Sequence, residues 1–299
     1  GYETMSCASS RITALVVDQN SVEELPAGAE AELVLDQTPF YAESGGQVGD
    51  VGEIRSIETG EVLAYVKGTY PAVAGLTVQK IVTAAPLHVG DAVAAFVNED
   101  ARRATMRNHT ATHLAHAALR KVLGIHVKQA GSVVDPSRLR FDFSHYTAMD
   151  AEEIAEVERL VNEEILRNTA VSTEVMALDS AIETGAMALF GEKYGEKVRV
   201  VSVPGFSTEL CGGTHVQRTG DIGLLKVVHE SSISAGVRRM EAITGAGALK
   251  RFQETSNSVN SAATLLKTKE SDLLDQIEKL LAQQKATERE LAQLREKAA

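Results

Sequence analysis

The sequence is poor in several features that would assign it to a specialised class of protein. Its 299 residues include only two cysteines, Cys7 and Cys211, so no disulfide framework is predicted and a reducing compartment, the cytoplasm, is expected. No run of about 18 apolar residues occurs, and a membrane-spanning helix is therefore not predicted. The first residues, GYETMSCASS, lack the basic segment and apolar core of a secretory signal. They also lack an initiator methionine, which favours a piece of a longer protein.

Positive charge is scarce in the first third of the chain. Residues 1–100 hold 4 Lys/Arg against 15 Asp/Glu, residues 101–250 hold 18 of each sign, and residues 251–299 hold 8 of each. The net charge of −11 therefore comes from the first third alone. Basic clusters remain further along, at Arg102-Arg103 and at Arg238-Arg239. Because local patches bind phosphates even on an acidic protein, the overall charge does not exclude a nucleic-acid partner.

Residues 1–98 are predicted to form a small β-barrel. Short alternating or β-branched runs such as RITALVV and AELVLDQT are separated by Gly, Pro and Asp turns. Within this region FYAESGGQVGD, residues 40–50, has three glycines in five positions. Such density is typical of a tight turn or of a close approach of the backbone to another group. By itself the segment favours the turn.

Residues 99–247 are predicted to form an α+β domain. A helix is expected from the N-cap Asn98 to about Leu123, with Gly124 at its C-cap. A hairpin around the turn DPSR follows, and then an amphipathic helix over residues 150–168. Further strands and one short helix complete a layered α+β fold.

Residues 248–299 are predicted to form one long helix. Apolar residues recur mostly at heptad positions, and no Pro or Gly interrupts them, which favours a coiled coil. The partner of this helix would be another chain or a helix absent from this one. The heptads still run at Ala299, which again favours a truncated protein.

The stretch RNHTATHLAH carries two histidines at helical spacing. His109 and His113 are four residues apart and therefore lie on one face of the predicted helix. The motif CGGTH places Cys211 and His215 at the same spacing, and the four side chains form a Cys-His₃ set that suits zinc. Thr110 occupies the position at which the zinc-protease motif HExxH needs its glutamate, which excludes that class of enzyme.

The spacing leaves two questions open about this set. His116 falls almost on the face of His109; it is interpreted as a packing residue, with metal ligation as the alternative. Three ligands and an open fourth position would let zinc bind a substrate group or polarise water. Four tight ligands would instead make the metal a positioning element.

The motifs RNHTATHL with HVKQAGSVV, CGGTH and ISAGVRRMEAITG together resemble the editing domains of alanyl-tRNA synthetases and the freestanding deacylases related to them. FYAESGGQVGD is similar to the accessory β-barrel of that family, and the final helix looks like the start of its coiled coil. The resemblance covers essentially the whole chain and implies an internal part of an ATP-dependent ligase without its ATP-binding core. This part would hydrolyse tRNA(Ala) mischarged with serine or glycine, because a synthetic site that fits alanine cannot strongly exclude either.

The resemblance also implies roles for individual residues. His109, His113, Cys211 and His215 are the implied ligands of one zinc ion per chain. Gln129 is implied in editing, and Thr112 is a candidate for a polar contact to the amino acid. A further set is expected to shape the pocket or to contact the tRNA end, with structural ion pairs as an equal alternative for its charged members: Gly45, Gly46, Arg238, Arg239 and Glu241.

Two other functions are compatible with the sequence. The first is a zinc-stabilised module that binds tRNA or dimerises without catalysis. The second is a freestanding trans-editing deacylase, against which the absent initiator methionine and the unfinished heptads argue. The expected partner is tRNA(Ala), especially its aminoacylated 3′ end, and a homodimer could form through the coiled coil or a missing C-terminal domain. No membrane partner is expected.

Overall fold

A computed structural model describes residues 2, 4–187 and 195–298 of the chain. The predicted ranges 1–98 and 248–299 also contain Gly1, Glu3 and Ala299, which lie outside the described residues. Two structural units are present, residues 1–247 and residues 248–299. None of the described helices is long and apolar enough to cross a membrane.

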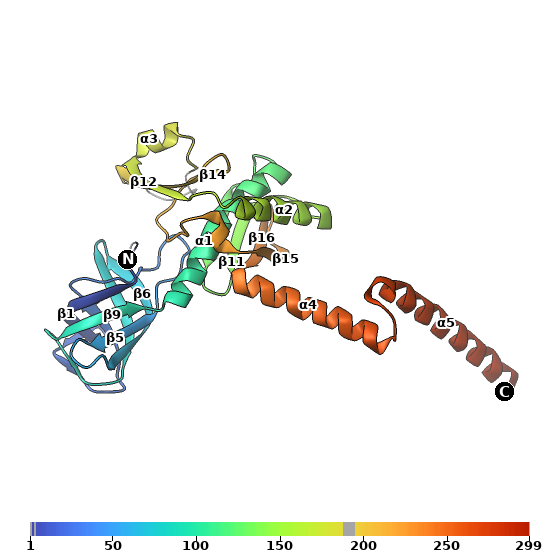
Figure 1. Cartoon of the computed structure of the whole chain (residues 1–299), viewed down its shortest axis with the longest axis horizontal. Coiled ribbons are helices and arrows are strands. Elements are labelled where there is room, and N and C mark those ends of the chain that lie inside the picture. The colour runs from blue at the N-terminus through green and yellow to red at the C-terminus, as the bar shows by residue number, and fades with distance from the viewer. Residues whose placement is uncertain (1, 3, 188–194, 299) are drawn as a thin grey trace. The chain divides into compact units, whose positions relative to one another are not determined.

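Residues 6–97 form a closed antiparallel barrel (Figure 1). It has six strands in the order β1-β4-β7-β6-β5-β9, with β9 paired back to β1. The barrel strands are β1 (Ser6–Val17), β4 (Glu30–Leu35), β5 (Gly52–Ser56), β6 (Val62–Val73), β7 (Leu76–Thr83) and β9 (Ala92–Val97). Three short strands flank them: β2 (Asn20–Val22), β3 (Glu24–Leu25) and β8 (Leu87–His88). The interior is filled by aliphatic side chains such as Ile12, Leu33 and Ile54, all fully buried. The predicted barrel is therefore confirmed, and its interior is a packed core.

Helix α1 (Glu99–Leu123) connects the barrel to the next layer. Its first turn is capped by Asn98, whose side-chain oxygen accepts a hydrogen bond from the N–H of Ala101 at 3.0 Å. At its other end the N–H of Gly124 donates to the carbonyl of Arg120. Both predicted caps are confirmed, and they fix where the helix starts and stops.

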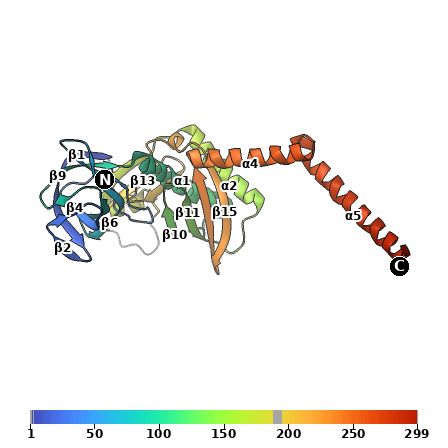
Figure 2. The same cartoon turned by 90° about the horizontal axis from the view of Figure 1, so that it is seen from below.

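An antiparallel sheet in the order β10-β11-β16-β15 forms the second layer (Figure 2). Its strands are β10 (Gln129–Val134), β11 (Leu139–Ser144), β15 (Leu225–Ser234) and β16 (Val237–Thr244). Helices α1 and α2 (Ala151–Arg167) contact this sheet, and Phe141 of β11 shares a buried cluster with Leu114 of α1 and Val157 of α2. Asp150 and Glu153 form a capping box at the start of α2, where the sequence predicts the helix to begin. The predicted α+β class is confirmed.

A smaller sheet, in the order β12-β13-β14, leads to the CGGTH motif. It consists of β12 (Ser172–Ala177), β13 (Lys197–Val203) and β14 (Ser207–Leu210), with the short helix α3 (Leu178–Glu183) after β12. A 3₁₀ turn, η1 (Thr219–Ile222), precedes β15. Because β14 ends at Leu210, the motif begins where the strand stops.

The last 52 residues contain two helices instead of the single one predicted. Helix α4 (Gly245–Leu265) and helix α5 (Leu273–Ala298) are separated by a turn that includes η2 (Glu270–Asp272). Lys267 adopts φ +51°, and the N–H of Thr268 donates to the carbonyl of Ala263 at 3.0 Å, which ends α4 in the manner of a left-handed cap. The prediction of one continuous helix is wrong. No residue of α5 is buried in the described chain, and its coiled-coil pairing stays a prediction.

The glycine-rich segment 40–50 joins the barrel to the edge of the second sheet. The N–H of Val134 donates to the carbonyl of Gly46 at 2.8 Å, and the N–H of Val48 donates back to Val134 at 3.0 Å. A Cβ on Gly46, where φ is +86°, would lie 2.3 Å from the carbonyl oxygen of Ser132. The segment turns between Ser44 and Gln47. It is therefore both a turn and a close approach, although the sequence alone favours the turn.

A buried ion pair fixes this segment to α1. Arg102 is 2% exposed and donates through Nε to the Asp50 carboxylate at 2.8 Å. The same carboxylate accepts the backbone N–H of Tyr41 at 2.7 Å, and the Arg102 guanidinium also donates to the carbonyl of Pro39 at 3.2 Å. Because both charges are buried and paired with each other, neither can be removed without leaving the other uncompensated.

We expect Arg102→Met to destabilise the protein by about 3–5 kcal/mol, because it leaves the Asp50 carboxylate buried without its partner. The neighbouring Arg103 provides a matched control, since it is exposed and forms a surface ion pair with Glu99 at 3.2 Å. Arg103→Ala should cost less than about 1 kcal/mol. Urea denaturation followed by circular dichroism measures both values, and equal effects of the two substitutions would contradict this role for Arg102.

Candidate metal centre

The first half of the candidate centre lies on α1. His109 and His113 are 5% and 7% exposed, and their rings stack with centroids 5.4 Å apart. This is the geometry expected for positions i and i+4 of a helix. The buried surroundings come from the position of α1 between the glycine-rich segment and the second sheet.

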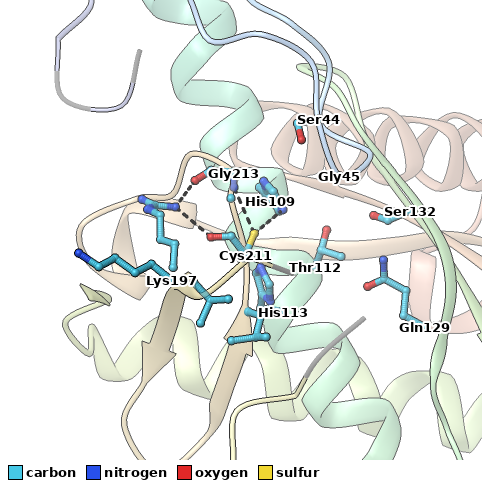
Figure 3. Close-up of a pocket in the computed structure, with 15 residues that line it drawn as sticks. Ser44, Gly45, His109, Thr112, His113, Gln129, Ser132, Lys197, Cys211 and Gly213 are labelled. Carbon is cyan, nitrogen blue, oxygen red and sulfur yellow. Dashed lines mark hydrogen bonds between the residues drawn. The ribbon is translucent and has the colours of Figure 1, made fainter. Parts of the chain in front are cut away.

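The CGGTH motif supplies the second half. Cys211 and His215 follow β14, and the Sγ of Cys211 lies 3.4 Å from His109 Nε2 and 3.2 Å from His215 Nε2. One potential ligand atom from each of His109, His113, Cys211 and His215 lies within 4.8 Å of all the others. Figure 3 shows the thiol of Cys211 next to His109 and His113. The structure thus brings together all four residues that the sequence selects.

The outer nitrogen of each imidazole contacts a side chain of the protein. His109 Nδ1 donates to Gln47 Oε1 at 2.7 Å, and His113 Nδ1 lies 2.5 Å from the carboxylate of Glu209. His215 Nδ1 lies 3.1 Å from the hydroxyl of Thr110. The Nε2 atoms are consequently turned inward, and within the described part of the chain His113 Nε2 is buried without a hydrogen-bond partner. An inward-facing, unpartnered imidazole nitrogen beside a thiol is a donor set that a zinc ion fits.

The charges of the centre depend on one another. Burial disfavours the imidazolium of His113, but Glu209 and Cys211 outweigh it and raise its pKa to about 10. Burial also disfavours the thiolate of Cys211, yet the three histidines hold its pKa well below the usual range of a thiol. Burial lowers the pKa of His215 to about 3. The protein therefore favours the thiolate form of Cys211, which is the form that ligates a metal.

Glu209 is the buried carboxylate behind the centre. Although burial opposes its charge, hydrogen bonds and attraction from His113 and His116 lower its pKa to about 2. His116 Nδ1 lies 2.8 Å from Glu209, so this histidine belongs to the layer around the four-residue set and not to the set itself. The sequence predicts His116 to be a packing residue. This prediction is incomplete, because the ring also forms a hydrogen bond with the Glu209 carboxylate.

A cavity of about 250 Å³ opens beside the centre. Its described lining includes three of the four ligand candidates, His109, His113 and Cys211. Several polar side chains also line it, among them Ser44, Thr112, Gln129, Ser132 and Lys197. Figure 3 shows Ser44, Thr112, Gln129 and Ser132 on one side of Cys211 and Lys197 on the other. The volume is slightly below that of pockets for drug-sized ligands and suits a small polar group.

Gln129 and Thr112 both line this cavity, as their expected roles require. Gln129 is the first residue of β10. Thr112 is buried and already donates its hydroxyl to the carbonyl of Asn108 at 2.8 Å, which leaves its oxygen free to accept. Gly45 lines the cavity as well, whereas Gly46 faces Ser132 in the strand beside it.

The three charged residues of β16 form ion pairs. Arg238 donates to Glu230 at 2.5 and 2.7 Å, and Arg239 donates to Asp142 at 2.7 and 2.8 Å. Glu241 accepts from Arg138 at 3.2 Å. None of the three is among the described residues that line the cavity. Their contacts favour the structural alternative over a direct contact with substrate.

Three residues next to the centre are missing from the sequence prediction: Gln47, Glu209 and Arg199. The guanidinium of Arg199 donates to the carbonyls of Cys211, at 3.3 Å, and Gly213, and so holds the turn of the motif. Two of the three stand next to motifs that the sequence does reveal, since Gln47 follows Gly46 and Glu209 precedes Cys211 by two positions. Their position next to these motifs is the feature of the sequence that could have identified them as neighbours of the centre.

Comparisons with known proteins give a consistent result. Residues 198–241 match the family model "Threonyl and Alanyl tRNA synthetase second additional domain", and residues 1–101 match the model "tRNA synthetases class II (A)". The whole chain is 62% identical to an alanine–tRNA ligase of Solibacter usitatus, 51% to one of Bordetella pertussis and 50% to one of Polynucleobacter asymbioticus. In each case the chain covers 34% of the relative, so it spans about a third of the length of these proteins.

We expect Gly213→Ala to disturb the centre, because the added Cβ would lie 2.0 Å from His109 Cε1 and 2.8 Å from Gln47 Oε1. Overpacking of this kind costs about 1–3 kcal/mol. Gly212→Ala is the matched control, since among the described residues its Cβ would meet the Tyr2 hydroxyl alone, at 3.9 Å. Urea denaturation of both variants tests the difference, and a neutral Gly213→Ala would show that the His109 ring is not held against the motif.

Proposed function

The chain belongs to the alanine–tRNA ligase family, and we propose that it is the part that edits mischarged tRNA by hydrolysing the ester of Ser-tRNA(Ala) and Gly-tRNA(Ala). The synthetic site of such a ligase cannot strongly exclude glycine, which is smaller than alanine, or serine, which adds one hydroxyl. A second, hydrolytic site corrects both errors. Ligation itself, which needs ATP, would belong to the parent protein outside this chain.

One observation carries this proposal: a buried Cys-His₃ set opens directly onto a small polar cavity. His109, His113, Cys211 and His215 lie within 4.8 Å of one another and supply three nitrogens and a sulfur, which fit one tetrahedral zinc ion per chain. When bound there, zinc would supply Lewis-acid polarisation of a substrate group or of water. The cavity of about 250 Å³ is of a size for an aminoacyl group.

The residues of the chain would position the ester for attack by water. The tRNA end would enter between Ser44 and Gly45 of the barrel segment and the strand β10, since both sides line the cavity. Water would form the new bond to the ester carbonyl, and the ribose oxygen would leave with the proton. Because an aminoacyl ester is already activated, orientation by Gln129 would contribute much of the acceleration.

Discrimination between serine and alanine, as distinct from the hydrolysis of the glycyl ester, would come from a polar contact that only the serine hydroxyl can complete. Thr112 lines the cavity and has an oxygen available to accept a hydrogen bond. A serine hydroxyl would donate to it, whereas the methyl group of alanine would leave the contact unmade. The chain would thereby spare correctly charged tRNA.

Further expectations belong to the same proposal. The partner is tRNA(Ala), the compartment is the cytoplasm, and α4 and α5 would contribute to tRNA positioning or to a homodimer. A freestanding deacylase would share the chemistry, and a structural zinc module would share the metal without hydrolysis. The experiments below separate hydrolysis from metal binding.

We expect the chain to release serine from Ser-tRNA(Ala), to leave Ala-tRNA(Ala) intact and to contain about one zinc ion, because the ligand set is complete. Cys211→Ala should lose both the zinc and the hydrolysis. Cys7→Ala is the matched control, since Cys7 lies on β1 of the barrel and outside the centre. Elemental analysis and a deacylation assay on the same samples provide the measurement. Normal hydrolysis by Cys211→Ala would contradict the proposal, and zinc without hydrolysis in the unaltered chain would favour the structural module.

We expect Gln129→Ala to lower the rate of serine release on the order of 10²-fold while the zinc content stays unchanged, because a polar group at the cavity wall orients the reacting ester. Gln37→Ala, an exposed substitution in the barrel just after β4, serves as the control. Single-turnover deacylation reports the rate of each variant. An unchanged rate for Gln129→Ala would remove this residue from the proposed mechanism.

A further inference from the structure

We propose that Gln47, a residue of the barrel, is the positioning residue that fixes the His109 ring in the orientation needed for metal binding. The inference rests on the zinc part of the proposed function and extends it across the two layers of the fold. It makes the barrel a component of the metal centre and not only a neighbour of it.

The contacts of Gln47 determine both its own orientation and that of His109. Its side chain is buried, at 1% exposure, and Oε1 accepts from His109 Nδ1 at 2.7 Å and from the N–H of Thr214 at 2.8 Å. Its Nε2 donates to the hydroxyl of Thr214 at 2.8 Å. A flipped amide would place an NH₂ group against the Thr214 N–H, two donors facing each other, so only one orientation satisfies all three bonds.

The hydrogen bond to Nδ1 has a direct consequence for the metal. An imidazole whose Nδ1 carries the proton presents a lone pair on Nε2, which is the nitrogen of His109 that faces Cys211. Without the acceptor, the ring would be free to place its proton on Nε2 or to rotate. Thr214 lies next to His215, so the same amide joins the helix half of the ligand set to the motif half.

The backbone holds Gln47 in place on both sides. The neighbours of Gln47, Gly46 and Val48, each form a hydrogen bond to Val134 of β10. Gly213 lies against the other side of the amide, where a Cβ would come within 2.8 Å of Oε1. Because the segment is clamped in this way, the side chain is held in position before any metal arrives.

Charge explains why an amide suits this position better than an acid. When zinc is bound, the Cys211 sulfur beside His109 is held as the thiolate, and the Glu209 carboxylate lies against His113, so the occupied centre contains two negative groups. A zinc dication would balance these two charges, whereas a carboxylate at position 47 would add a third. Gln47 thus orients a ligand without disturbing the neutrality of the occupied centre.

The test measures zinc affinity in the whole chain by competition with a chromophoric chelator. We expect Gln47→Met, which keeps the length and removes the hydrogen bonds, to weaken zinc binding about 10- to 100-fold. Gln47→Glu keeps the acceptor for His109 Nδ1 but loses the donor to Thr214 and adds a charge, so we expect it to weaken zinc binding less than Gln47→Met does. Long-range ¹H–¹⁵N NMR of the metal-free chain should show His109 with its proton on Nδ1, and a mixture of tautomers in Gln47→Met.

Gln79→Met is the matched control. Gln79 is a fully buried glutamine of the same barrel whose amide donates to Thr38 at 3.3 Å, and it has no contact with the centre. We expect this variant to bind zinc as the unaltered chain does. Equal loss of zinc in Gln79→Met and Gln47→Met would show that only the integrity of the barrel matters and would overturn the inference.

The two proposals fail in different ways. If the unaltered chain binds no zinc, the metal part of the proposed function is wrong and this inference falls with it. If the unaltered chain binds zinc and Gln47→Met binds it equally well with an unchanged His109 tautomer, only the role of Gln47 is wrong.

Discussion

The buried pair of Arg102 and Asp50 is the interaction on which the arrangement of this molecule depends. Both charges lie inside the protein, and each is bonded to the other and to backbone groups of residues 39–41. Uncompensated charges are too costly in such a place, so α1 and the glycine-rich segment have to keep one relative position. Seven residues after Arg102 the same helix presents His109, and three residues before Asp50 the same segment presents Gln47. The hydrogen bond between these two residues follows from the ion pair.

The three imidazole rings of the centre have chemically different hydrogen-bond partners. His109 meets a neutral amide, His113 a carboxylate and His215 a hydroxyl. The three imidazoles consequently differ in charge preference, as the raised pKa of His113 and the lowered pKa of His215 show. A cation bound among them would meet one anionic sulfur and one histidine supported by a carboxylate, an arrangement that binds a dication without excess charge.

Local features of the sequence predict much of this structure. Helical spacing places His109 and His113 on one face, and Asn98 and Gly124 mark the ends of their helix, because these properties depend on residues within a few positions of one another. The repeated four-residue spacing at Cys211 and His215 identifies the remaining members of the set. The resemblance of the motifs to alanyl-tRNA synthetases is confirmed by relatives that match the whole chain.

The partners of two residues beside the centre could not be predicted from the sequence. Gln47 contacts His109, 62 residues away, and Glu209 contacts His113, 96 residues away. Contacts between residues so far apart leave no periodic pattern in the sequence. The end of α4 was missed for a related reason: Lys267 takes the left-handed conformation usually marked by glycine.

The sequence separations of these contacts also determine the order in which parts of the protein can fold. The hydrogen bond between Gln47 and Thr214 closes a separation of 167 residues, and the contact between Cys211 and His109 closes one of 102. Contacts of such long range form late and slowly in folding, because the loop must be closed before the contact contributes any stability. During synthesis from the N-terminus, the barrel and the start of β10 leave the ribosome long before the CGGTH motif does. For that interval the imidazole side of α1 lacks the cover that Cys211 and His215 supply, although β11 and α2 can already cover its apolar side. The histidine side chains of α1 are therefore more accessible at this stage of biogenesis than in the finished protein.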